Sequence, residues 1–437
     1  MSQRSDRFRS PDSRGSTAIL VAIQLPHVTD SEVTTSLSEL ERLVSSLGIR
    51  VLGTTLQKRA NATSLSLLGE GKVRELATLT GGPGGDPQPP SARSEIANLV
   101  VIDTELTPGQ LRNLELALGV DVLDRTAIIL RVFEQRAQTR EARLEVEIAR
   151  LLHEAPRIRD DASLGDREGG GGRGGRGHSN VELAKQRNRE RVAALRRELE
   201  GARAAQEARR ARRKDTPRVA LVGYTNAGKS SLMRALTGSD VLVEDKLFAT
   251  LGTTVRALQP ETTPRILVSD TVGFIKNLPH GLIASFRSTL DEAHDAGLLL
   301  YVVDAADPEL RNQLELTRHV IEEIGASEIP SRVLLNKIDR VSPEERHRLA
   351  AELPEALHLS AHDAGDMQRL RETLIAFFDE AWASEHFDVP YARSGLLGEL
   401  RTSVRIMSEE YTERGMRLGV RGPPAVLARL RQLLERG

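Results

Sequence analysis

A glycine-bearing turn near the middle of the chain has the residue types that bind phosphate. Residues 219–222 (VALV) are apolar, and Gly223 is then separated by four residues from Gly228, Lys229 and Ser230, which is P-loop spacing. The glycines let backbone N–H groups curl round a phosphate, the lysine supplies a positive charge, and the serine hydroxyl can hold Mg²⁺. The helix that follows presents its positive N-terminus to the anion. A surface turn that matches by chance is the alternative for this motif alone.

A second polar motif follows the next apolar stretch, at residues 265–270 (RILVSD). Asp270 and Gly273 form a D-x-x-G, in which the carboxylate can reach Mg²⁺ through a water. Gly273 lets its own N–H approach a γ-phosphate. Between the two motifs, residues 247–256 (LFATLGTTVR) have the place of a flexible switch, with Thr250 as the Mg²⁺ ligand and Thr253 and Thr254 as rivals. A threonine-rich edge strand is the alternative for this segment.

Two more motifs predict which base is bound. Residues 333–335 lead into Asn336, Lys337 and Asp339, an N-K-x-D. The Asp339 carboxylate can accept from both N1–H and the 2-amino group of guanine, a donor pair that adenine lacks. Leaving that carboxylate unpaired rejects ATP by roughly 10⁴-fold or more. Residues 356–359 then run into Ser360 and Ala361, whose N–H groups could meet the guanine O6.

Four motifs in this order predict a site for GTP or GDP with Mg²⁺. The predicted catalytic residues are Lys229, Thr250 and Gly273, and the predicted Mg²⁺ ligands are Ser230, Thr250 and Asp270. The residues predicted to contact the nucleotide are Gly223, Tyr224, Thr225, Asn226, Ala227, Gly228, Lys229, Ser230, Ser231, Phe248, Ala249, Thr250, Asp270, Thr271, Val272, Gly273, Asn336, Lys337, Asp339, Ser360 and Ala361.

The whole chain has the length and composition of a multidomain protein. Its 437 residues suffice for two to four domains. A formal net charge of −1 argues against a uniformly basic nucleic-acid binder, and the lack of cysteine excludes disulfides and a thiol nucleophile. No apolar run approaches the roughly 18 residues that span a bilayer. The polar first 17 residues are expected to be a disordered tail.

Strands and helices alternate in the first part of the chain, which predicts a small α/β domain with a parallel sheet. Strands are expected at residues 18–25, 49–56 and 98–103, and helices at 31–48, 72–79 and 108–119. Residues 81–91 (GGPGGDPQPPS) should form a mobile loop.

Residues 123–158 contain a helical run that ends before Pro156, with Leu144, Ile148 and Leu151 on one face. A second long helix is expected at 181–213, and the glycine-rich residues 165–180 should join the two as an antiparallel pair. Residues 171–214 hold 14 Lys and Arg against 5 Asp and Glu. A solvated helix face is one interpretation of this charge, and an RNA phosphate-binding arm with Arg173 and Arg176 at its tip is the other.

These residues resemble the HflX family of ribosome-associated GTPases. The resemblance rests on SLLGEGKVREL, TELTPGQLRNLE, TREARLEVEIARL, GYTNAGKSSLMRALTG, LFATLGTTVR, SDTVGFIKNLP, LNKID and SAHDAG. This chain departs from the family pattern at Gly252, where an aspartate is usual, and at His178, Ser179 and Asn180, which replace a G-P-G-E-like end of the glycine loop.

The resemblance implies an overall α/β fold class in several parts. The expected domains are a tail (1–17), a small parallel α/β domain (18–130), a helical hairpin with its glycine-rich loop (131–215), a Ras-like P-loop GTPase domain (216–384) and a small α/β appendage (385–437). It also implies a cytoplasmic monomer, with or without peripheral membrane association, that binds RNA and proteins of the large ribosomal subunit rather than DNA. Members of the family split or rescue stalled ribosomes under stress.

Hydrolysis by this chain should be slow without a partner. Many GTPases have a glutamine after D-x-x-G to orient the attacking water, and this chain has Phe274. The sequence identifies no arginine finger within the chain, although Arg256 is a candidate. The resemblance implies that the activator is the ribosome, and we expect GTP to order the loops around Thr250 and Gly273 for tight binding and hydrolysis to release the subunit. A GTPase of ribosome assembly or other RNA processing, and a GTP-dependent RNA-binding scaffold, remain as alternatives.

Overall fold

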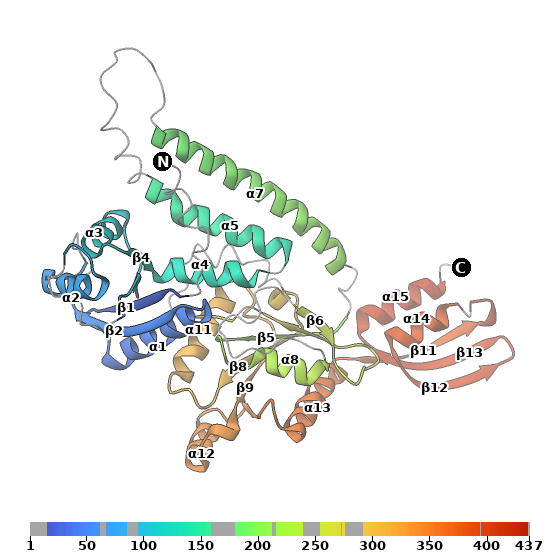
Figure 1. The fold of residues 1–437 in the computed structure, drawn as a ribbon. Coiled ribbons are helices and arrows are strands. Elements are labelled where there is room, and N and C mark those ends of the chain that lie inside the picture. The colour runs from blue at the N-terminus through green and yellow to red at the C-terminus, as the bar shows by residue number, and fades with distance from the viewer. Residues whose placement is uncertain are drawn as a thin grey trace. The chain divides into compact units, whose positions relative to one another are not determined.

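The computed structural model describes residues 15–61, 67–84, 95–137, 139–158, 180–211, 216–238, 254–271, 273–275, 292–393 and 395–435 (Figure 1). These residues form two compact units, one up to residue 201 and the other from residue 202 onward. The expected glycine-rich loop at 165–180 and most of the loop at 81–91 lie outside the described residues.

The first unit begins with a four-stranded parallel sheet in the order β2-β1-β3-β4. Its strands are β1 (Thr17–Gln24), β2 (Arg50–Lys58), β3 (Leu99–Ile102) and β4 (Asp121–Asp124), and its helices are α1 (Asp30–Ser46), α2 (Glu70–Thr80) and α3 (Pro108–Leu118). The predicted parallel α/β fold is confirmed. The sequence reasoning missed β4, a short strand that pairs in register with β3.

Local signals in the sequence set the ends of these helices. Thr29 and Glu32 form a reciprocal capping box before α1, and Thr107 and Gln110 do the same before α3. Gly119 ends α3 in the left-handed conformation, with φ of 70°, which glycine adopts without strain. Capping therefore fixes where the apolar faces of α1 and α3 meet the sheet.

The helical run expected across residues 123–158 is two helices, α4 (Arg125–Arg136) and α5 (Arg140–Glu154), followed by the 3₁₀ turn η1 (Ala155–Arg157). Ala137 adopts an extended conformation, and the Thr139 side chain accepts from the N–H of Ala142 to start α5. The sequence reasoning did not separate these two helices, which the cap at Thr139 divides. The expected domain boundary between residues 130 and 131 falls inside α4.

α5 packs against α7 (Asn180–Ala211) as an antiparallel pair. Three contacts establish the direction: Arg140 pairs with Glu198, Arg191 pairs with Glu147, and Asn188 donates to the carbonyl of Leu151. As the contacting residue moves later along α5, its partner lies earlier in α7, which is the pattern of an antiparallel pair. The apolar seam between the helices is formed by Leu144, Ile148, Leu151, Val192, Leu195 and Leu199.

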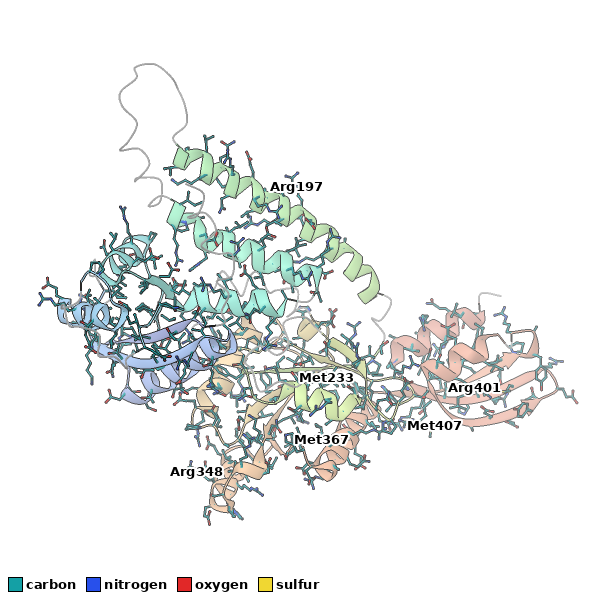
Figure 2. All side chains as sticks on the ribbon, viewed as in Figure 1. Arg197, Met233, Arg348, Met367, Arg401 and Met407 are labelled. Carbon is teal, nitrogen blue, oxygen red and sulfur yellow. The ribbon has the colours of Figure 1, made fainter. Side chains whose placement is uncertain are left out.

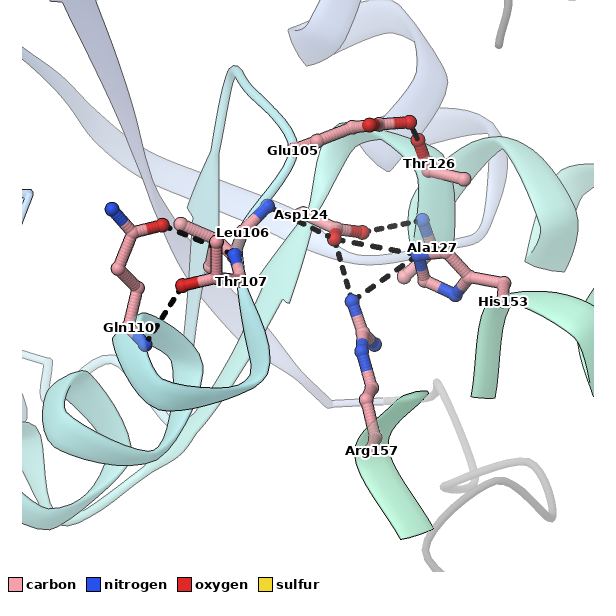
Figure 3. Close-up of polar contacts among 9 residues, drawn as sticks. All are labelled: Glu105, Leu106, Thr107, Gln110, Asp124, Thr126, Ala127, His153 and Arg157. Carbon is pink, nitrogen blue, oxygen red and sulfur yellow. Dashed lines mark hydrogen bonds and ion pairs between the residues drawn. The ribbon is translucent and has the colours of Figure 1, made fainter. Parts of the chain in front are cut away.

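A buried ionic network ties α5 and η1 to the end of the sheet (Figure 3). Asp124, the last residue of β4, accepts from the Arg157 guanidinium at 2.6 Å and lies 3.4 Å from His153 Nε2. Its other carboxylate oxygen accepts from the N–H of Ala127 at 2.8 Å and so caps α4. Although burial alone raises the pKa of Asp124, hydrogen bonds and the charges of His153 and Arg157 hold it below its usual value.

The neighbouring Arg125 lies at the centre of a second buried network. Its side chain is only 3% exposed and pairs with Glu39 on α1 and with Asp103 after β3, the latter at 2.6 Å. The same guanidinium donates to the Ser36 hydroxyl. One cation therefore joins α1, β3 and α4.

The second unit contains a six-stranded sheet in the order β10-β9-β8-β5-β7-β6, parallel except for the edge strand β6. Its strands are β5 (Arg218–Gly223), β6 (Thr254–Ala257), β7 (Leu267–Asp270), β8 (Leu298–Asp304), β9 (Ser331–Asn336) and β10 (Leu357–His358). Its helices are α8 (Lys229–Thr237), α11 (Leu310–Glu323), α12 (Pro343–Glu352) and α13 (Ala364–Glu380).

A smaller antiparallel sheet, in the order β11-β13-β12, follows α13. It is built from β11 (Ala383–Pro390), β12 (Arg405–Thr412) and β13 (Gly415–Gly422), with α14 (Leu396–Ser403) and α15 (Pro424–Glu435). Arg405 pairs with Asp379 of α13 and stacks over the ring of Trp382. The expected boundary between residues 384 and 385 falls inside β11. Across the described residues, no helix combines the length and apolarity needed to cross a membrane.

Candidate functional site: a P-loop at the carboxyl edge of the second sheet

The turn after β5 has a backbone that only glycine permits at two positions. Gly223 and Gly228 have φ of 153° and 95°. A Cβ at Gly223 would lie 2.2 Å from the carbonyl oxygen of Val302, and one at Gly228 would lie 2.1 Å from the Asn336 amide nitrogen. These two glycines of the predicted P-loop are thus required for the loop to pack against β8 and against the end of β9.

Lys229 begins α8 and turns its ammonium group back over the loop. Its Nζ donates to the carbonyl oxygens of Gly223 and Tyr224 at 2.9 and 2.8 Å. Burial lowers the pKa of Lys229 to about 8, and the charge of Asp270 opposes this shift. The ammonium group is therefore held inside the loop where a phosphate would be cradled, in surroundings that leave its charge poorly solvated.

Ser230 and Asp270 bring two oxygen donors together. The Ser230 hydroxyl donates to Asp270 Oδ2 at 2.9 Å. Asp270 is the last residue of β7 and is fully buried. A hydroxyl beside a carboxylate is a donor set that suits Mg²⁺, which prefers hard oxygen ligands.

The segment after β7 lies directly against the P-loop. Thr225 N–H donates to the carbonyl of Phe274 at 2.7 Å, and Phe274 N–H donates to that of Gly223 at 3.1 Å. A Cβ at Gly273 would lie 2.8 Å from Thr225 Cγ2 and 3.0 Å from Lys229 Nζ. Gly273 thus permits the close approach of the D-x-x-G segment to Lys229.

Asn336 and Lys337 fasten the base-recognition loop to the P-loop. The Asn336 amide donates to the carbonyl of Ala227 at 2.8 Å and accepts from the N–H of Ala361 at 3.1 Å. Lys337 Nζ donates to the carbonyl of Asn226 and to Asp304 Oδ2, both at 2.7 Å. Sequence reasoning missed Asp304, although it ends an apolar strand just as Asp270 does.

Asp339, the residue predicted to recognise guanine, is exposed. A hydrogen bond from the Ser360 hydroxyl is the main cause that lowers the pKa of Asp339. The N–H groups of Ser360 and Ala361, expected to meet the guanine O6, instead donate to Asp366 and Asn336 within the protein. In this structure their role is to order the loop that carries the Ser360 hydroxyl.

The structure brings most of the predicted residues to one edge of the sheet. Thr271 has a structural contact, since its buried hydroxyl donates to the carbonyl of Leu221 at 2.7 Å. Ser231 is half-buried in the first turn of α8. Phe248, Ala249, Thr250 and Val272 lie outside the described residues. Arg256, the candidate arginine finger, is on β6, where its guanidinium donates to the carbonyl of Val255.

Three family models match successive parts of the chain. Residues 34–134 match the model described as "GTP-binding GTPase N-terminal", and residues 136–213 match "GTP-binding GTPase Middle Region". Residues 218–337, which contain the P-loop and the D-x-x-G and N-K-x-D motifs, match "50S ribosome-binding GTPase". The matched regions follow the division into sheet, hairpin and P-loop domain.

Two bacterial relatives and one solved archaeal protein match this chain along most of their length. A solved GTP-binding protein from Sulfolobus solfataricus in complex with GDP is 23% identical over 83% of this chain and 98% of its own, but its TM-score of 0.43 makes the likeness a loose one. The GTPase HflX of Gluconacetobacter diazotrophicus is 51% identical over 95% of this chain and 97% of its own length. That of Escherichia coli is 38% identical over 82% of each chain. The chain therefore belongs to the HflX family of GTPases, enzymes that bind guanine nucleotide and hydrolyse GTP.

Proposed function

We propose that this GTPase acts on the ribosome: it binds the large subunit in its GTP form, splits or rescues stalled ribosomes, and hydrolyses GTP faster when the subunit is bound. The family model over residues 218–337 is described as a 50S ribosome-binding GTPase, which supports the choice of partner. The observation that carries the proposal is the environment of Phe274.

Phe274 occupies the position where many GTPases have the glutamine that orients water. Its side chain has no hydrogen-bonding group and is 3% exposed, and both of its backbone polar groups are bonded to the P-loop. This residue cannot orient an attacking water from where it lies. Efficient hydrolysis therefore needs a group from a partner, or a rearrangement that a partner induces.

Lys229 and Gly273 would contact the β- and γ-phosphates, because both lie beside the loop that cradles them. Ser230 and Asp270 would hold Mg²⁺, with Thr250 as the proposed further ligand. The bound ion would neutralise charge on the phosphate oxygens. Asp339 would select guanine, with the Ser360 hydroxyl keeping its carboxylate ionised and oriented.

The exposed sides of α7 supply a surface for ribosomal RNA. Arg187, Arg196 and Arg197 are exposed along this helix, and no carboxylate of the described residues pairs with them. Arg197 projects from the helix in Figure 2. Unpaired guanidinium groups on one helix are suited to phosphate contacts, which give salt-dependent binding. Arg191, in contrast, already pairs with Glu147 across the hairpin.

Purified large subunits provide the direct test. We expect the GTP hydrolysis rate to rise strongly when subunits are added, while replacing Arg187, Arg196 and Arg197 by Gln should weaken the stimulation and leave the basal rate unchanged. Arg318→Gln, an exposed arginine paired with Glu315 on α11, is the matched control. Equal rates with and without subunits would contradict the proposal and favour a GTP-dependent RNA-binding scaffold.

Sedimentation then distinguishes splitting from other ribosome-linked roles. Intact ribosomes incubated with the protein and a slowly hydrolysed GTP analogue should separate into subunits. Stimulated hydrolysis without dissociation would instead support a GTPase of subunit assembly. Omitting the nucleotide controls for dissociation by the protein alone.

A further inference from the structure

A groove with a volume of about 720 Å³ lies where the edge of the GTPase sheet faces the C-terminal domain. Strands β6 and β7 form one wall, and the end of α14 and the start of α15 form the other. The volume is within the range of small-molecule sites. The residues that line the groove are Thr216, Val255, Arg256, Ala257, Arg265, Leu267, Thr402, Ser403, Val426 and Arg429.

Among the described residues of this lining, the charged ones are three arginines, Arg256, Arg265 and Arg429, and none is acidic. Hydroxyl groups from Thr216, Thr402 and Ser403 complete the polar part of the wall. A groove that served only to join two domains would be expected to pair its cations across the interface. Here the lining from both sides carries charge of the same sign.

Two of these arginines have carboxylate partners, and each partner lies outside the lining. Arg265 pairs with Glu261 at 3.0 Å and Arg429 with Glu399 at 3.3 Å, and all four side chains are more than a third exposed. Exposed pairs of this kind contribute little and exchange partners readily. Arg256 pairs with no carboxylate of the described residues.

The groove is distinct from the nucleotide site, although the same pair of strands reaches both. Thr254 of β6 lies opposite Asp270, at the nucleotide edge, while Ala257 lies opposite Leu267 in the groove. Three residues of extended strand separate these positions, or about 10 Å. Arg256, next to Ala257 on β6, is one of the residues that line the groove.

We propose that this groove binds a phosphate-bearing ligand, held by the guanidinium groups of Arg256, Arg265 and Arg429. Guanidinium groups match phosphate oxygens in a bidentate manner, and three of them compensate more than one negative charge. Free phosphorylated metabolites and the phosphate backbone of RNA share this chemistry. Binding would join the GTPase sheet to the C-terminal domain through one anion.

Pyrophosphate is the probe that tests for a free phosphorylated ligand. The full-length protein is first saturated with GDP and Mg²⁺, so that the P-loop cannot take the probe, and is then titrated with pyrophosphate by calorimetry. We expect one binding event in the wild-type protein and a weakening of at least about tenfold in Arg256→Gln, the loss of one charge-assisted contact. Thermal melting and GDP affinity should stay unchanged, which shows that the variant is folded.

Arg348→Gln provides the matched control. Arg348 is about as exposed as Arg265 and is paired with a nearby glutamate in the same way, but it lies on α12, between β9 and β10, at the opposite edge of the sheet (Figure 2). This variant should bind pyrophosphate like the wild type. Equal weakening in Arg348→Gln and Arg256→Gln would mean a general charge effect and would overturn the proposal.

A single-stranded RNA oligonucleotide, titrated at several salt concentrations, is the probe that tests for binding of an RNA phosphate backbone. RNA binding that Arg256→Gln weakens, with a smaller salt slope and with no binding of pyrophosphate, would assign the groove to an RNA backbone. Pyrophosphate binding that depends on Arg256 would assign it to a free phosphorylated ligand. If Arg256→Gln alters neither titration, the groove is not a phosphate site.

Discussion

The four-stranded N-terminal sheet and the six-stranded GTPase sheet each carry charged groups at the carboxyl ends of parallel strands, but these groups have different partners in the two sheets. In the N-terminal sheet, Asp103 follows β3 and pairs with the buried Arg125, and Asp124 ends β4 and pairs with the partly buried Arg157. In the GTPase sheet, Asp270 accepts from a serine hydroxyl. Parallel topology thus brings polar residues together in both, and the identity of the partners decides what they do.

The consequences for the cations differ just as clearly. Arg125 is surrounded by carboxylates and joins three elements of its domain. Lys229 is held mainly by backbone carbonyls, and burial depresses its pKa to about 8. A cation already neutralised by the protein stabilises the fold, whereas one that is desolvated and only partly compensated is suited to receive a phosphate. Mutations at the two edges should therefore affect different properties.

The largest expected effect is a change of base selectivity in Asp339→Asn. The amide can donate to the 2-oxo group of xanthine but cannot accept from both guanine donors, so the preference for guanine over xanthine nucleotide should fall by roughly 10⁴-fold. Competition between GDP and xanthosine diphosphate measures it. Stability should not change, because Asp339 is exposed. Retained guanine preference would remove Asp339 from the site.

Arg125→Met should have the next largest effect, and on stability alone. It leaves Glu39 and Asp103 buried without their cation, which costs about 3–5 kcal/mol. The single tryptophan, Trp382, reports on the other unit, so hydrogen exchange in peptides from β1 and α4 is the suitable measurement. GTP hydrolysis without ribosomes should be unaffected under conditions where the N-terminal domain stays folded.

Arg140→Met is the control that separates the effect of removing any ion-paired arginine from the effect of removing a buried one. Arg140 pairs with Glu198 across the hairpin, but its side chain is 70% exposed. Its replacement should cost no more than about 1 kcal/mol. Similar destabilisation by the two variants would mean that burial does not distinguish the networks, and the contrast between the two sheets would fail.

Lys229→Ala should show the reverse behaviour: lost function with an intact fold. Hydrolysis under single-turnover conditions should fall by roughly 10²–10³-fold, since a charge aimed at the phosphates is removed. The unfolding free energy should not decrease, because the ammonium group is buried at an electrostatic cost that alanine does not carry. A variant that melted well below the wild type would show that Lys229 is structural, as Arg125 is.

The sequence indicates the P-loop and the N-K-x-D loop more directly than the surrounding architecture, because the signals for these loops are local. The spacing from Gly223 to Ser230 and the N-K-x-D motif are readable along the chain. The break at Ala137 depends on a cap by Thr139 that competes with a long helix-forming sequence. The sequence of β8 (LLLYVVD) is apolar, but no recognisable motif adjoins it, so this strand was not predicted.

Contacts between distant residues were beyond sequence reasoning. Nothing in the sequence indicates that the N–H of Ala361 donates to Asn336, or that Arg256 lines a groove with Arg429. Both follow from how strands and helices pack in three dimensions. The same holds for Arg125, whose neighbours Glu39 and Asp103 come from other elements of the fold.

The smallest expected effect, a pH dependence of GDP binding, examines the charge of Lys229 most directly. With its pKa lowered to about 8, the free protein loses the lysine proton above that pH, whereas a bound phosphate favours the protonated form. Binding then takes up a proton, so affinity should be constant below pH 8 and fall by up to about tenfold per pH unit above it. Lys229→Ala lacks this titrating group, so its pH profile retains only the titration of guanine itself. The difference between the wild-type and variant profiles therefore gives the contribution of the lysine to GDP affinity. Parallel pH profiles would mean that protein groups neutralise the charge of Lys229 as fully as they neutralise that of Arg125. The contrast between the two sheets would then fail.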